Sequence, residues 1–501
     1  MVRWMVSELP AGWAETTLGA IGSVQSGMGF PLEMQGQTEG VYPVYKVGDV
    51  SRGVLLDRGI LRRSTNYVDA EAAAILKGHI FPEGSILFAK IGEALRLNRR
   101  AIVFREGLAD NNVMGFKADQ GIDDGFLYHF LRTQDLASLS RSTTIPSIRK
   151  SDVEDITISL PPLAEQKRIV QKLDALLAQV DTLKARIDAM PALLKRFREA
   201  TLTSAMSGTL TKDWRIESSQ STAPEAPRMC RQLLANERER IWRGRGKYKP
   251  AVRSGEVDAS EFSNLPEVWH RGTLDEITWS VKDGPHFSPK YATDGVRFIS
   301  GGNIRPGRID LSTGKYISQE LHEELSARCK PEYLDVLYTK GGTTGFAAVN
   351  RTESEFNVWV HVAVLKMLPP SVVDPFFVEF ALNSPECYAQ SQRYTHGVGN
   401  QDLGLRRMIK IVLPVPPIGE QREIVRRVEQ LFAYADQLEA KVATAKQRID
   451  ALTQSLLAKA FRGELVPQDP AAEPASVLLD RIRAQRAATP KPKRGRKAAT
   501  S

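Results

Sequence analysis

Apolar residues in two distant stretches of the chain recur at alternating steps of four and three positions. This spacing is typical of a helix that packs along one seam against another helix. The first stretch has Ile169, Leu173, Leu176, Val180, Leu183 and Ile187. The second has Ile424, Val428, Leu431, Ala435, Leu438, Val442, Ala445, Ile449, Leu452 and Leu456. The pattern predicts two rods of roughly 60 Å, given about 40 residues at 1.5 Å each.

The two stretches are copies of one sequence. Residues Pro161–Thr211 recur without a gap, 255 positions later, as Pro416–Val466, and 15 of the 51 aligned positions are identical. Each copy opens with a Pro-Pro pair, which suits the first turn of a helix. Matching glycines, Gly208 and Gly463, are predicted to end the helices.

The copies carry an acidic residue in the first turn, Glu165 or Glu420, where the helix dipole favours negative charge. They differ at Pro191, which stands where the second copy has Lys446. Proline removes a helical hydrogen bond and clashes with the preceding turn. We therefore expect a kink or break near Met190 in the first helix only.

The regions before the two helices resemble each other weakly but in the same order. The matching pairs are Leu9–Trp13 with Leu265–Trp269, Gly84–Lys90 with Leu334–Lys340, and Phe126–Leu131 with Phe376–Ala381. Both regions have short β-rich runs with Gly/Asp turns, a helical patch and a closing strand, at Ile156–Leu160 and Ile409–Leu413. Each is predicted to be an α+β domain.

The chain is therefore interpreted as a twofold internal repeat of domain and helix, each followed by a short helix and a basic segment. The predicted parts are a first α+β domain (1–158), a first spacer helix (159–210), a linker with a short helix at 228–242 (211–263), a second α+β domain (264–414), a second spacer helix (415–463), and a final segment with a helix at 475–488 and a basic disordered tail (464–501). If the spacer helices form an antiparallel coiled coil, the domains are related by a pseudo-twofold axis. Such a protein can place equivalent surfaces on two sites of a DNA duplex that face opposite ways.

Composition favours a polyanionic partner. The net charge is +9 and the pI is about 9.3, and no run of apolar residues is long enough to span a membrane. The three cysteines, Cys230, Cys329 and Cys387, are far apart and form no Cys-x-x-Cys pair. A disulfide framework or zinc site is therefore not expected, and a reducing cytoplasm fits the composition.

We find no catalytic motif in the sequence. Gly314-Lys315 and Gly246-Lys247 lack the rest of a Walker phosphate loop, and no amino-methyltransferase motif or His-Glu-x-x-His motif occurs. The seven histidines have no metal-ligand spacing. No catalytic residue, resident cofactor or metal is therefore predicted for this chain.

Basic and amide-rich loops recur in both predicted domains. Arg and Lys neutralise phosphates, Arg also reads guanine, Asn and Gln read adenine, and Ser and Thr serve either role. Any one of these residues is more often a solvated surface group, so the recurrence supports the set as a whole. The candidate DNA-binding residues are Lys90, Arg96, Asn98, Arg99, Arg100, Arg141, Thr143, Thr144, Arg149, Lys150, Lys282, His286, Lys290, Asn303, Lys340, Thr343, Thr344, Arg393, His396, Asn400 and Gln401.

Several motifs together resemble the specificity (S) subunits of type I restriction–modification systems, over nearly the whole chain. The most specific is a strand followed by Leu-Pro, a further proline and Glu-Gln, which occurs twice, in Ile158–Val170 and Ile411–Val425. The helix ends Ala205–Leu210 and Phe461–Leu465 also fit, as do Lys282–Pro289, Phe298–Ile304 and Gly341–Gly345, which resemble turns of the family's target-recognition domains. The first domain departs from the family pattern, because Gln25–Pro31 stands where Asp-Gly-x-His would be.

The resemblance implies a non-catalytic subunit whose two target-recognition domains each read one half of a split, asymmetric sequence in double-stranded DNA. It implies that the conserved helices form an antiparallel spacer and bind two methyltransferase (M) subunits, which restriction (R) subunits then join. S-adenosylmethionine, ATP and Mg²⁺ would belong to those partners, and the complex would methylate adenine and cut DNA. The outer faces of the spacer and the two short helices would be partner surfaces.

Two other classes of function remain open from the residues alone. An enzyme acting by itself, such as a methyltransferase or nuclease, is disfavoured by the missing motifs. A coiled-coil adaptor without DNA specificity of its own would need the heptad helices but not the basic loops.

Overall fold

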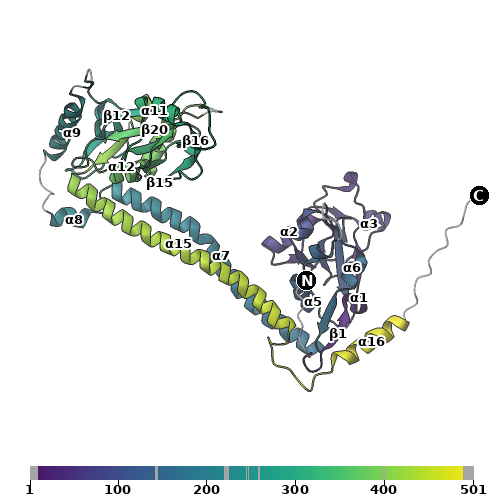
Figure 1. Cartoon of the computed structure of the whole chain (residues 1–501). Helices are drawn as coiled ribbons and strands as arrows, with labels where there is room; N and C mark the ends of the chain where they lie inside the picture. The colour runs from purple at the N-terminus through teal and green to yellow at the C-terminus, as the bar shows by residue number, and fades with distance from the viewer. Residues whose placement is uncertain are drawn as a thin grey trace, which may run out of the picture. The chain divides into compact units, whose positions relative to one another are not determined.

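The computed structural model of the chain describes residues 9–140, 145–218, 225–243, 245, 248–257, 260–397, 399 and 401–488. Contacts within the chain divide it into two units. One unit combines the first and last parts of the sequence, and the other is the middle part. Unit 1 comprises Met1–Ile187 with Thr444–Ser501, and unit 2 comprises Asp188–Ala443. Each unit holds one α+β domain, the first part of one long helix and the last part of the other (Figure 1).

The long helices are α7 (Leu163–Met206) and α15 (Ile418–Phe461), and each has 44 residues. Gly208 and Gly463 follow their ends with φ of 76° and 75°, a left-handed conformation that glycine adopts without strain. The predicted helix ends are thus confirmed. A break near Met190 is wrong, because α7 continues through Pro191 without interruption.

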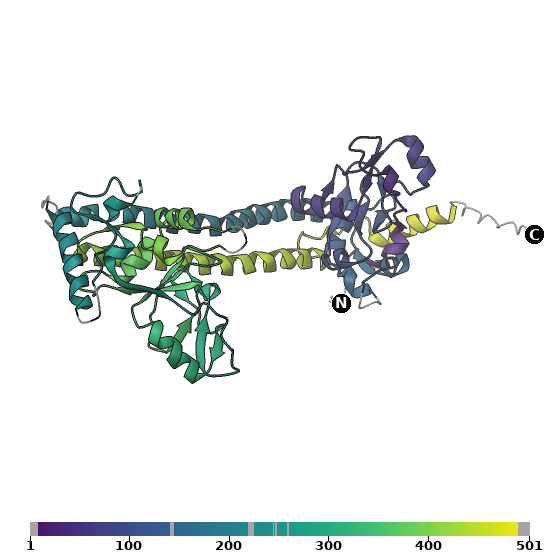
Figure 2. The same ribbon diagram turned by 90° about the horizontal axis from the view of Figure 1, so that it is seen from above.

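Within each unit, the segments of α7 and α15 lie side by side and run in opposite directions (Figure 2). Lys184 pairs with Asp450 at 3.1 Å in unit 1, and Arg198 pairs with Asp436 at 2.6 Å in unit 2. From the first ion pair to the second, the residue number rises in α7 and falls in α15. The prediction of antiparallel helices is thus confirmed.

The predicted seam is buried at some positions and exposed at others. Ile169, Leu173, Ile424 and Val428 are fully buried, whereas Leu183 and Leu452 remain 47% and 44% exposed. Leu177, Leu194, Leu202 and Leu457, which the seam prediction omitted, are buried as well. The buried face is wider at the ends because it meets the core of a domain as well as the other helix.

The domain of unit 1 is built on a five-stranded and a three-stranded sheet. The larger sheet has the order β2 (Gly22–Ser26), β9 (Val113–Ala118), β6 (Ile86–Ala89), β7 (Arg100–Val103), β4 (Ile60–Leu61). The smaller has β5 (Tyr67–Val68), β3 (Tyr42–Tyr45), β8 (Leu108–Ala109), and β1 (Ala14–Thr17) pairs with β10 (Thr157–Leu160). Its helices are α1 (Leu18–Ile21), η1 (Leu32–Met34), α2 (Val47–Leu56), α3 (Ala70–Leu76), α4 (Glu93–Arg96), α5 (Asp124–Thr133), η2 (Leu136–Leu139) and α6 (Lys150–Glu154).

The domain of unit 2 repeats this topology. Its sheets have the orders β12 (Thr278–Asp283), β20 (Val362–Met367), β17 (Val336–Thr339), β18 (Ala347–Val349) and β16 (Lys315–Ile317), β13 (Val296–Ile299), β19 (Phe356–Val358). The terminal pair is β11 (His270–Thr273) with β21 (Val412–Val415), and a hairpin of β14 (Ile304–Arg305) and β15 (Arg308–Ile309) is added. The helices are α10 (Leu274–Ile277), η5 (Gly301–Asn303), α11 (Gln319–Arg328), α12 (Pro375–Leu382), α13 (Pro385–Tyr394) and α14 (Leu405–Met408).

The α+β prediction and the internal repeat are confirmed in detail. The strands β3 and β8 pair in parallel, and so do their counterparts β13 and β19. All four residues of β6 and of β17 are buried, as expected for the middle strands of a covered sheet. The closing strand β21 begins three residues later than the strand expected at 409–413, because α14 occupies 405–408.

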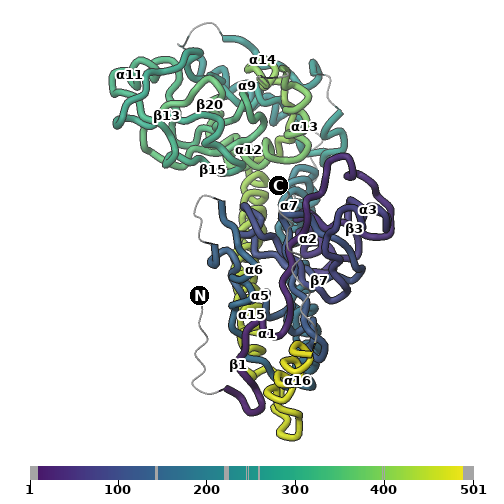
Figure 3. Tube along the Cα trace, turned by 90° about the vertical axis from the view of Figure 1, so that its right-hand side faces the viewer, coloured from purple at the N-terminus to yellow at the C-terminus, as the bar shows by residue number. Residues whose placement is uncertain are grey.

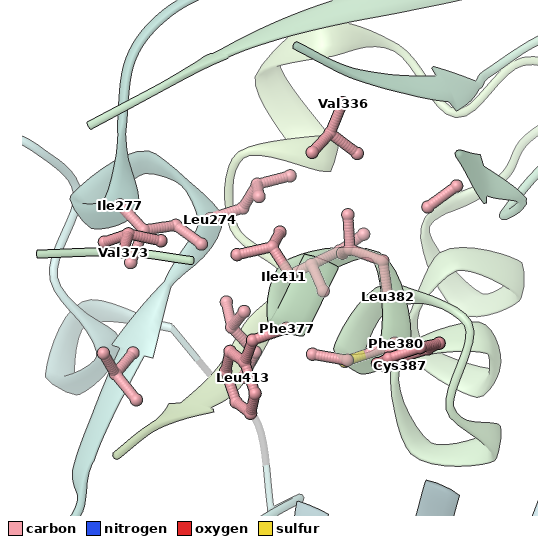
Figure 4. Packing of buried hydrophobic residues seen from close by; sticks show 14 of the residues in the cluster. Leu274, Ile277, Val336, Val373, Phe377, Phe380, Leu382, Cys387, Ile411 and Leu413 are labelled. Carbon is pink, nitrogen blue, oxygen red and sulfur yellow. The ribbon is translucent and has the colours of Figure 1, made fainter. Parts of the chain in front are cut away.

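The largest buried cluster of the second domain joins its four-stranded sheet, its terminal strand pair and several of its helices (Figure 4). Leu274 and Ile277 of α10, Phe377 of α12, and Ile411 and Leu413 near β21 belong to one buried cluster. The same cluster includes Ile424 and Val428 from the first turns of α15. The helix and the domain that precedes it therefore share one hydrophobic core.

A buried Glu-Gln pair fixes the start of each long helix to its domain. The indole N–H of Trp13 donates to Glu165 Oε2 at 3.2 Å, and that of Trp269 donates to Glu420 Oε2 at 2.8 Å. Both carboxylates are at most 1% exposed. The Trp and the Glu that recur in both halves of the sequence thus form the same hydrogen bond in each unit.

The glutamines that follow bond to the main chain of the same domain. Gln166 Oε1 accepts from the N–H of Asp123 at 3.0 Å, and Gln421 Oε1 accepts from the N–H of Asp374 at 2.8 Å. These two aspartates cap α5 and α12. Each pair therefore connects the N-terminus of a long helix with the N-terminus of a helix in the domain.

The end of the other long helix reaches the same carboxylate in each unit. In unit 2, Thr211 and Arg215, just after α7, donate to Glu420 at 2.7 and 2.6 Å. In unit 1, Gln468, after α15, donates to Glu165 at 3.2 Å. One buried carboxylate thus joins the domain, the start of one helix and the end of the other.

The short helices occupy equivalent places in the two units. After α8 (Lys212–Glu217), helix α9 (Ala226–Trp242) packs on the second domain, and α16 (Ala475–Ala488) packs on the first (Figure 3). Arg238 of α9 donates to the carbonyls of Asp275 and Thr278. Arg486 of α16 donates to those of Gly19 and Gly22 at 2.7 Å each. A single-turn helix, η4 (Ser254–Glu256), follows α9, and the predicted basic tail lies outside the described residues.

Replacing Gln421 with glutamate should destabilise unit 2. The Gln421 amide also donates to Pro416 O at 2.8 Å, and the side chain is 1% exposed, so the variant loses a donor and buries a charge. We expect a loss of roughly 3 kcal/mol in the free energy of unfolding, measured by urea denaturation. Gln430→Glu, on an exposed position of the same helix, is the control and should change it by less than about 0.5 kcal/mol. Equal effects of the two variants would contradict this role of the pair.

Candidate nucleic-acid interface

Two glycines bring the loops after β2 and β12 close to the opposite main chain. A Cβ atom on Gly284 would lie 1.8 Å from the carbonyl oxygen of Val358, and one on Gly27 would lie 1.9 Å from that of Asp110. No other residue fits such an approach. Gly27 therefore takes the place of Gly284, and the first domain departs from the Asp-Gly-x-His pattern only at Ser26 and Gly29.

In the second domain, a chain of ion pairs around the buried Lys340 and Asp283 joins three loops. Lys340, 4% exposed, lies after β17, and its Nζ is 3.0 Å from Asp402 Oδ1 and 3.5 Å from Asp283 Oδ2. Asp283 ends β12 and is also paired with Arg328 at 3.0 Å and His286 at 3.4 Å. The loops after β12, after β17 and before α14 are thus held together through one ammonium group.

Exposed predicted residues lie on these same three loops. They are Lys282, His286 and Lys290 around the loop after β12, Thr343 after β17, and Gln401 before α14. The carbonyl of Gln401 accepts from the N–H of Gly342 at 3.0 Å, so the second and third loops are bonded directly. The structure therefore brings five of the predicted residues to the edges of one cluster of loops.

Other predicted residues of the second domain form hydrogen bonds within its loops. Asn303 caps the turn at Ser300, whose N–H donates to Asn303 Oδ1 at 2.9 Å. Thr344, 2% exposed, accepts from the side chains of Gln392 and Thr395.

At the edge of this set, Arg393 and His396 are exposed, and Arg393 pairs with Glu261 at 2.5 Å. His396 exchanges main-chain hydrogen bonds with Asp402. It therefore belongs to the third loop of the cluster.

In the first domain, the loops after β6 and before α6 are also bonded to each other. The N–H of Gly92 donates to the carbonyl of Pro146 at 2.8 Å, and Ile148 donates to that of Lys90 at 3.0 Å. Lys90 and Arg99 are half-buried, whereas Arg96, Arg149 and Lys150 are exposed. Arg149 is the N-cap of α6, and Arg96 ends α4.

Arg100 and Asn98 of the predicted set bond to the main chain of their own domain. Arg100 is 2% exposed, its guanidinium donates to the carbonyls of Asn98 and Gln134, and burial lowers its pKa to about 10. Asn98 bonds Gln134 O and the N–H of Leu136. These side chains hold the turn before β7. Lys340 and Thr344 are also buried, at 4% and 2% exposed.

Four predicted residues, Arg141, Thr143, Thr144 and Asn400, lie outside the described residues. The prediction did not include Asp283, Asp402 or Arg328, which form ion pairs in this loop cluster. The two aspartates were omitted because carboxylates do not bind phosphate. The sequence offered a signal for both aspartates, because each is adjacent to a predicted DNA-binding residue: Asp283 follows Lys282, and Asp402 follows Gln401.

Comparison with known proteins decides the family. The model of the type I restriction modification DNA specificity domain matches this chain twice, at residues 10–191 and 266–445. The chain belongs to this family. Each match begins just before the Trp that binds the buried Glu and continues into the long helix that carries this Glu.

Curated members of the family resemble the chain over most of its length. The EcoBI specificity subunit of Escherichia coli is 31% identical, over 97% of this chain and 94% of its own. The EcoDI specificity subunit of Escherichia coli is 34% identical over 74% of this chain and 79% of its own, and the EcoKI specificity subunit of strain K12 is 28% identical over 91% and 97%.

Two solved structures share the fold. A chain from a study of complex assembly and conformational transition in the type I R-M system matches with a TM-score of 0.59 at 18% identity, over 91% of this chain and 99% of its own. The HsdS subunit of Thermoanaerobacter tengcongensis matches with a TM-score of 0.50 at 19% identity, over 91% and 98%. Two specificity domains with two long helices are thus the fold of this family member.

Replacing Lys282 with alanine should weaken DNA binding evenly across sequences. An exposed lysine beside the loop cluster is placed to neutralise a phosphate, so the negative slope of log K against log salt concentration should become shallower by ~0.9. Lys441→Ala, at an exposed position on α15, is the control and should leave the slope unchanged. A filter-binding salt titration measures both, and an unchanged slope for Lys282→Ala would remove this residue from the interface.

Proposed function

We propose that this chain is the DNA-specificity subunit of a type I restriction–modification enzyme and that each α+β domain reads one half of a bipartite, asymmetric target. The observation that supports this most directly is the repeat of one domain topology with different exposed loops. The loop after β2 has Ser26 and Gly29 where the loop after β12 has Asp283 and His286. Two domains that share a topology but differ in their exposed loops are suited to read two different half-sites of a DNA target.

The long helices would act as the spacer between the half-sites. Both have 44 residues, or roughly 66 Å at 1.5 Å per residue, and each takes part in both units. Their antiparallel pairing is compatible with half-sites read in opposite directions on the duplex.

Catalysis would come from partner subunits that methylate adenine and restrict DNA. Burial raises the pKa of the Cys230, Cys329 and Cys387 thiols to about 12, which leaves none of them as a thiolate nucleophile. S-adenosylmethionine, ATP and Mg²⁺ are assigned to those partners. Among the described residues, no helix is both long and apolar enough to cross a membrane.

Two methyltransferase subunits would bind equivalent surfaces of the twofold repeat. Exposed apolar residues offer such surfaces in both units. They are Phe197, Tyr434 and Met229 in unit 2, and Leu183, Leu452 and Val477 in unit 1. The restriction subunits would join this core.

Mapping methylated adenines in cells tests the proposal. Cells that express this chain with its methyltransferase should gain methylation at one split motif of fixed spacing, read by long-read sequencing against cells without this chain. Exchange of residues 264–414 for the corresponding domain of another specificity subunit should change one half of the motif and leave the other.

Different outcomes separate the alternatives. Methylation without a split motif, or a change in both halves after the exchange, would contradict the proposal. Methyl transfer from radiolabelled S-adenosylmethionine by the purified chain alone would show an enzyme. Absence of DNA binding even with the methyltransferase present would favour a coiled-coil adaptor.

A further inference from the structure

Lys90 and Lys340 occupy the same place in the two domains. Each follows the buried middle strand of its sheet, β6 or β17. The N–H of Lys90 donates to Asn112 O at 2.9 Å, and that of Lys340 donates to His361 O at 2.8 Å. The carbonyl of Lys90 accepts from Ile148 at 3.0 Å, and that of Lys340 accepts from Leu403 at 2.7 Å.

The residues around the two lysines correspond as well. An isolated β-bridge joins Ile91 with Ser147 in the first domain and Gly341 with Asp402 in the second. Ser147 therefore stands where Asp402 does. Ser26 stands where Asp283 does, because each directly precedes the glycine of the close main-chain approach.

Both carboxylates that surround Lys340 are thus serines around Lys90. The Lys340 ammonium is buried and lies within 3.5 Å of two carboxylates. In the part of the chain that the structure describes, no carboxylate lies within ion-pair distance of Lys90, which is half-buried. One lysine is neutralised inside its domain, and the other keeps its positive charge at the surface.

We infer that the two lysines have different roles in DNA recognition: Lys90 contacts a DNA phosphate directly, whereas Lys340 is a positioning residue that sets the three reading loops of the second domain. This inference rests on the proposed function and deepens it. An ammonium without an acidic partner gains an ion pair and releases counterions when it meets a phosphate. Lys340 already has two acidic partners, and leaving them would break an ion pair with Asp283, which is only 3% exposed.

The positioning role follows from what Lys340 joins. Asp283 and Asp402 belong to loops that carry Lys282, His286 and Gln401, all exposed. Removal of the lysine would leave Asp283 with Arg328 and His286 but would remove the cation that Asp283 shares with Asp402, so the connection between their two loops would be lost. The side chains that face the DNA would then lose their relative positions, although each would still be present.

The test uses the chain assembled with its methyltransferase subunits and duplexes that carry the mapped target, with either half-site altered. Lys90→Gln should make the negative slope of log K against log salt shallower by ~0.9 and weaken binding to all duplexes by a similar factor. Lys340→Gln should leave that slope unchanged. It should reduce discrimination at the second half-site by roughly tenfold and leave the first half-site as an internal control.

A double variant of the first domain makes the test reciprocal. Ser26→Asp with Ser147→Asp should place two carboxylates around Lys90 and reduce the salt slope as Lys90→Gln does, although the lysine is kept. Ser23→Asp with Ser159→Asp adds the same charge to other residues of that domain and is the control. It should retain most of the wild-type slope.

Asp402→Asn tests the second domain without a change in the buried core, because this side chain is 50% exposed. It should impair second-site discrimination in the same direction as Lys340→Gln, while the thermal midpoint of the complex stays close to that of the wild type.

The outcomes distinguish this inference from the proposed function. Wild-type complex without sequence-specific binding would overturn both. Specific wild-type binding together with an unchanged slope for Lys90→Gln would overturn the inference alone. So would a slope for Lys340→Gln that falls as far as that for Lys90→Gln, since the two lysines would then have the same role.

Discussion

The buried carboxylate at the start of each long helix is the interaction on which the rest of the structure depends. Glu165 and Glu420 are placed by helix geometry in a first turn, yet both are almost fully buried and bonded to an indole N–H. A buried carboxylate is tolerated only where donors surround it, so its Trp and the residues that follow the antiparallel helix must be in place. This requirement determines the direction in which a domain is attached to its helix. A reading surface on the domain can then keep a fixed orientation relative to the spacer.

The requirement that a buried charge be paired has opposite consequences for the two lysines in the loops after β6 and β17. Lys340 is buried and paired with two acids, so its charge is used within the protein. Lys90, in the equivalent place, has serines in the equivalent positions and keeps its charge for a partner. Duplication of a domain conserved the main-chain framework, including the glycines at 27 and 284, while side-chain changes at a few loop positions altered what each copy can bind.

Much of the fold could be predicted because it depends on local or periodic signals. The heptad spacing and the glycines Gly208 and Gly463 gave both long helices and their ends, and the repeated motifs gave two related domains. The partnership of Trp13 with Glu165 could not be predicted, since it joins residues 152 positions apart and each has an ordinary local explanation. The burial of Arg100 was missed for the same reason, because a basic run looks exposed until the turn before β7 folds over it. Pro191 does not break α7, because it removes one hydrogen bond from a helix of 44 residues that stays helical on both sides of it.

The central claim is that the paired helices fix the distance between two independent readers. Ion pairs Lys184–Asp450 and Arg198–Asp436 set the register of the pair, so insertions after Ile187 and after Lys446 face each other. One heptad inserted at both places keeps the seam in phase. Methylated-adenine mapping with this variant should give both half-sites unchanged and a longer gap between them. An unchanged gap, or an altered half-site, would contradict the account.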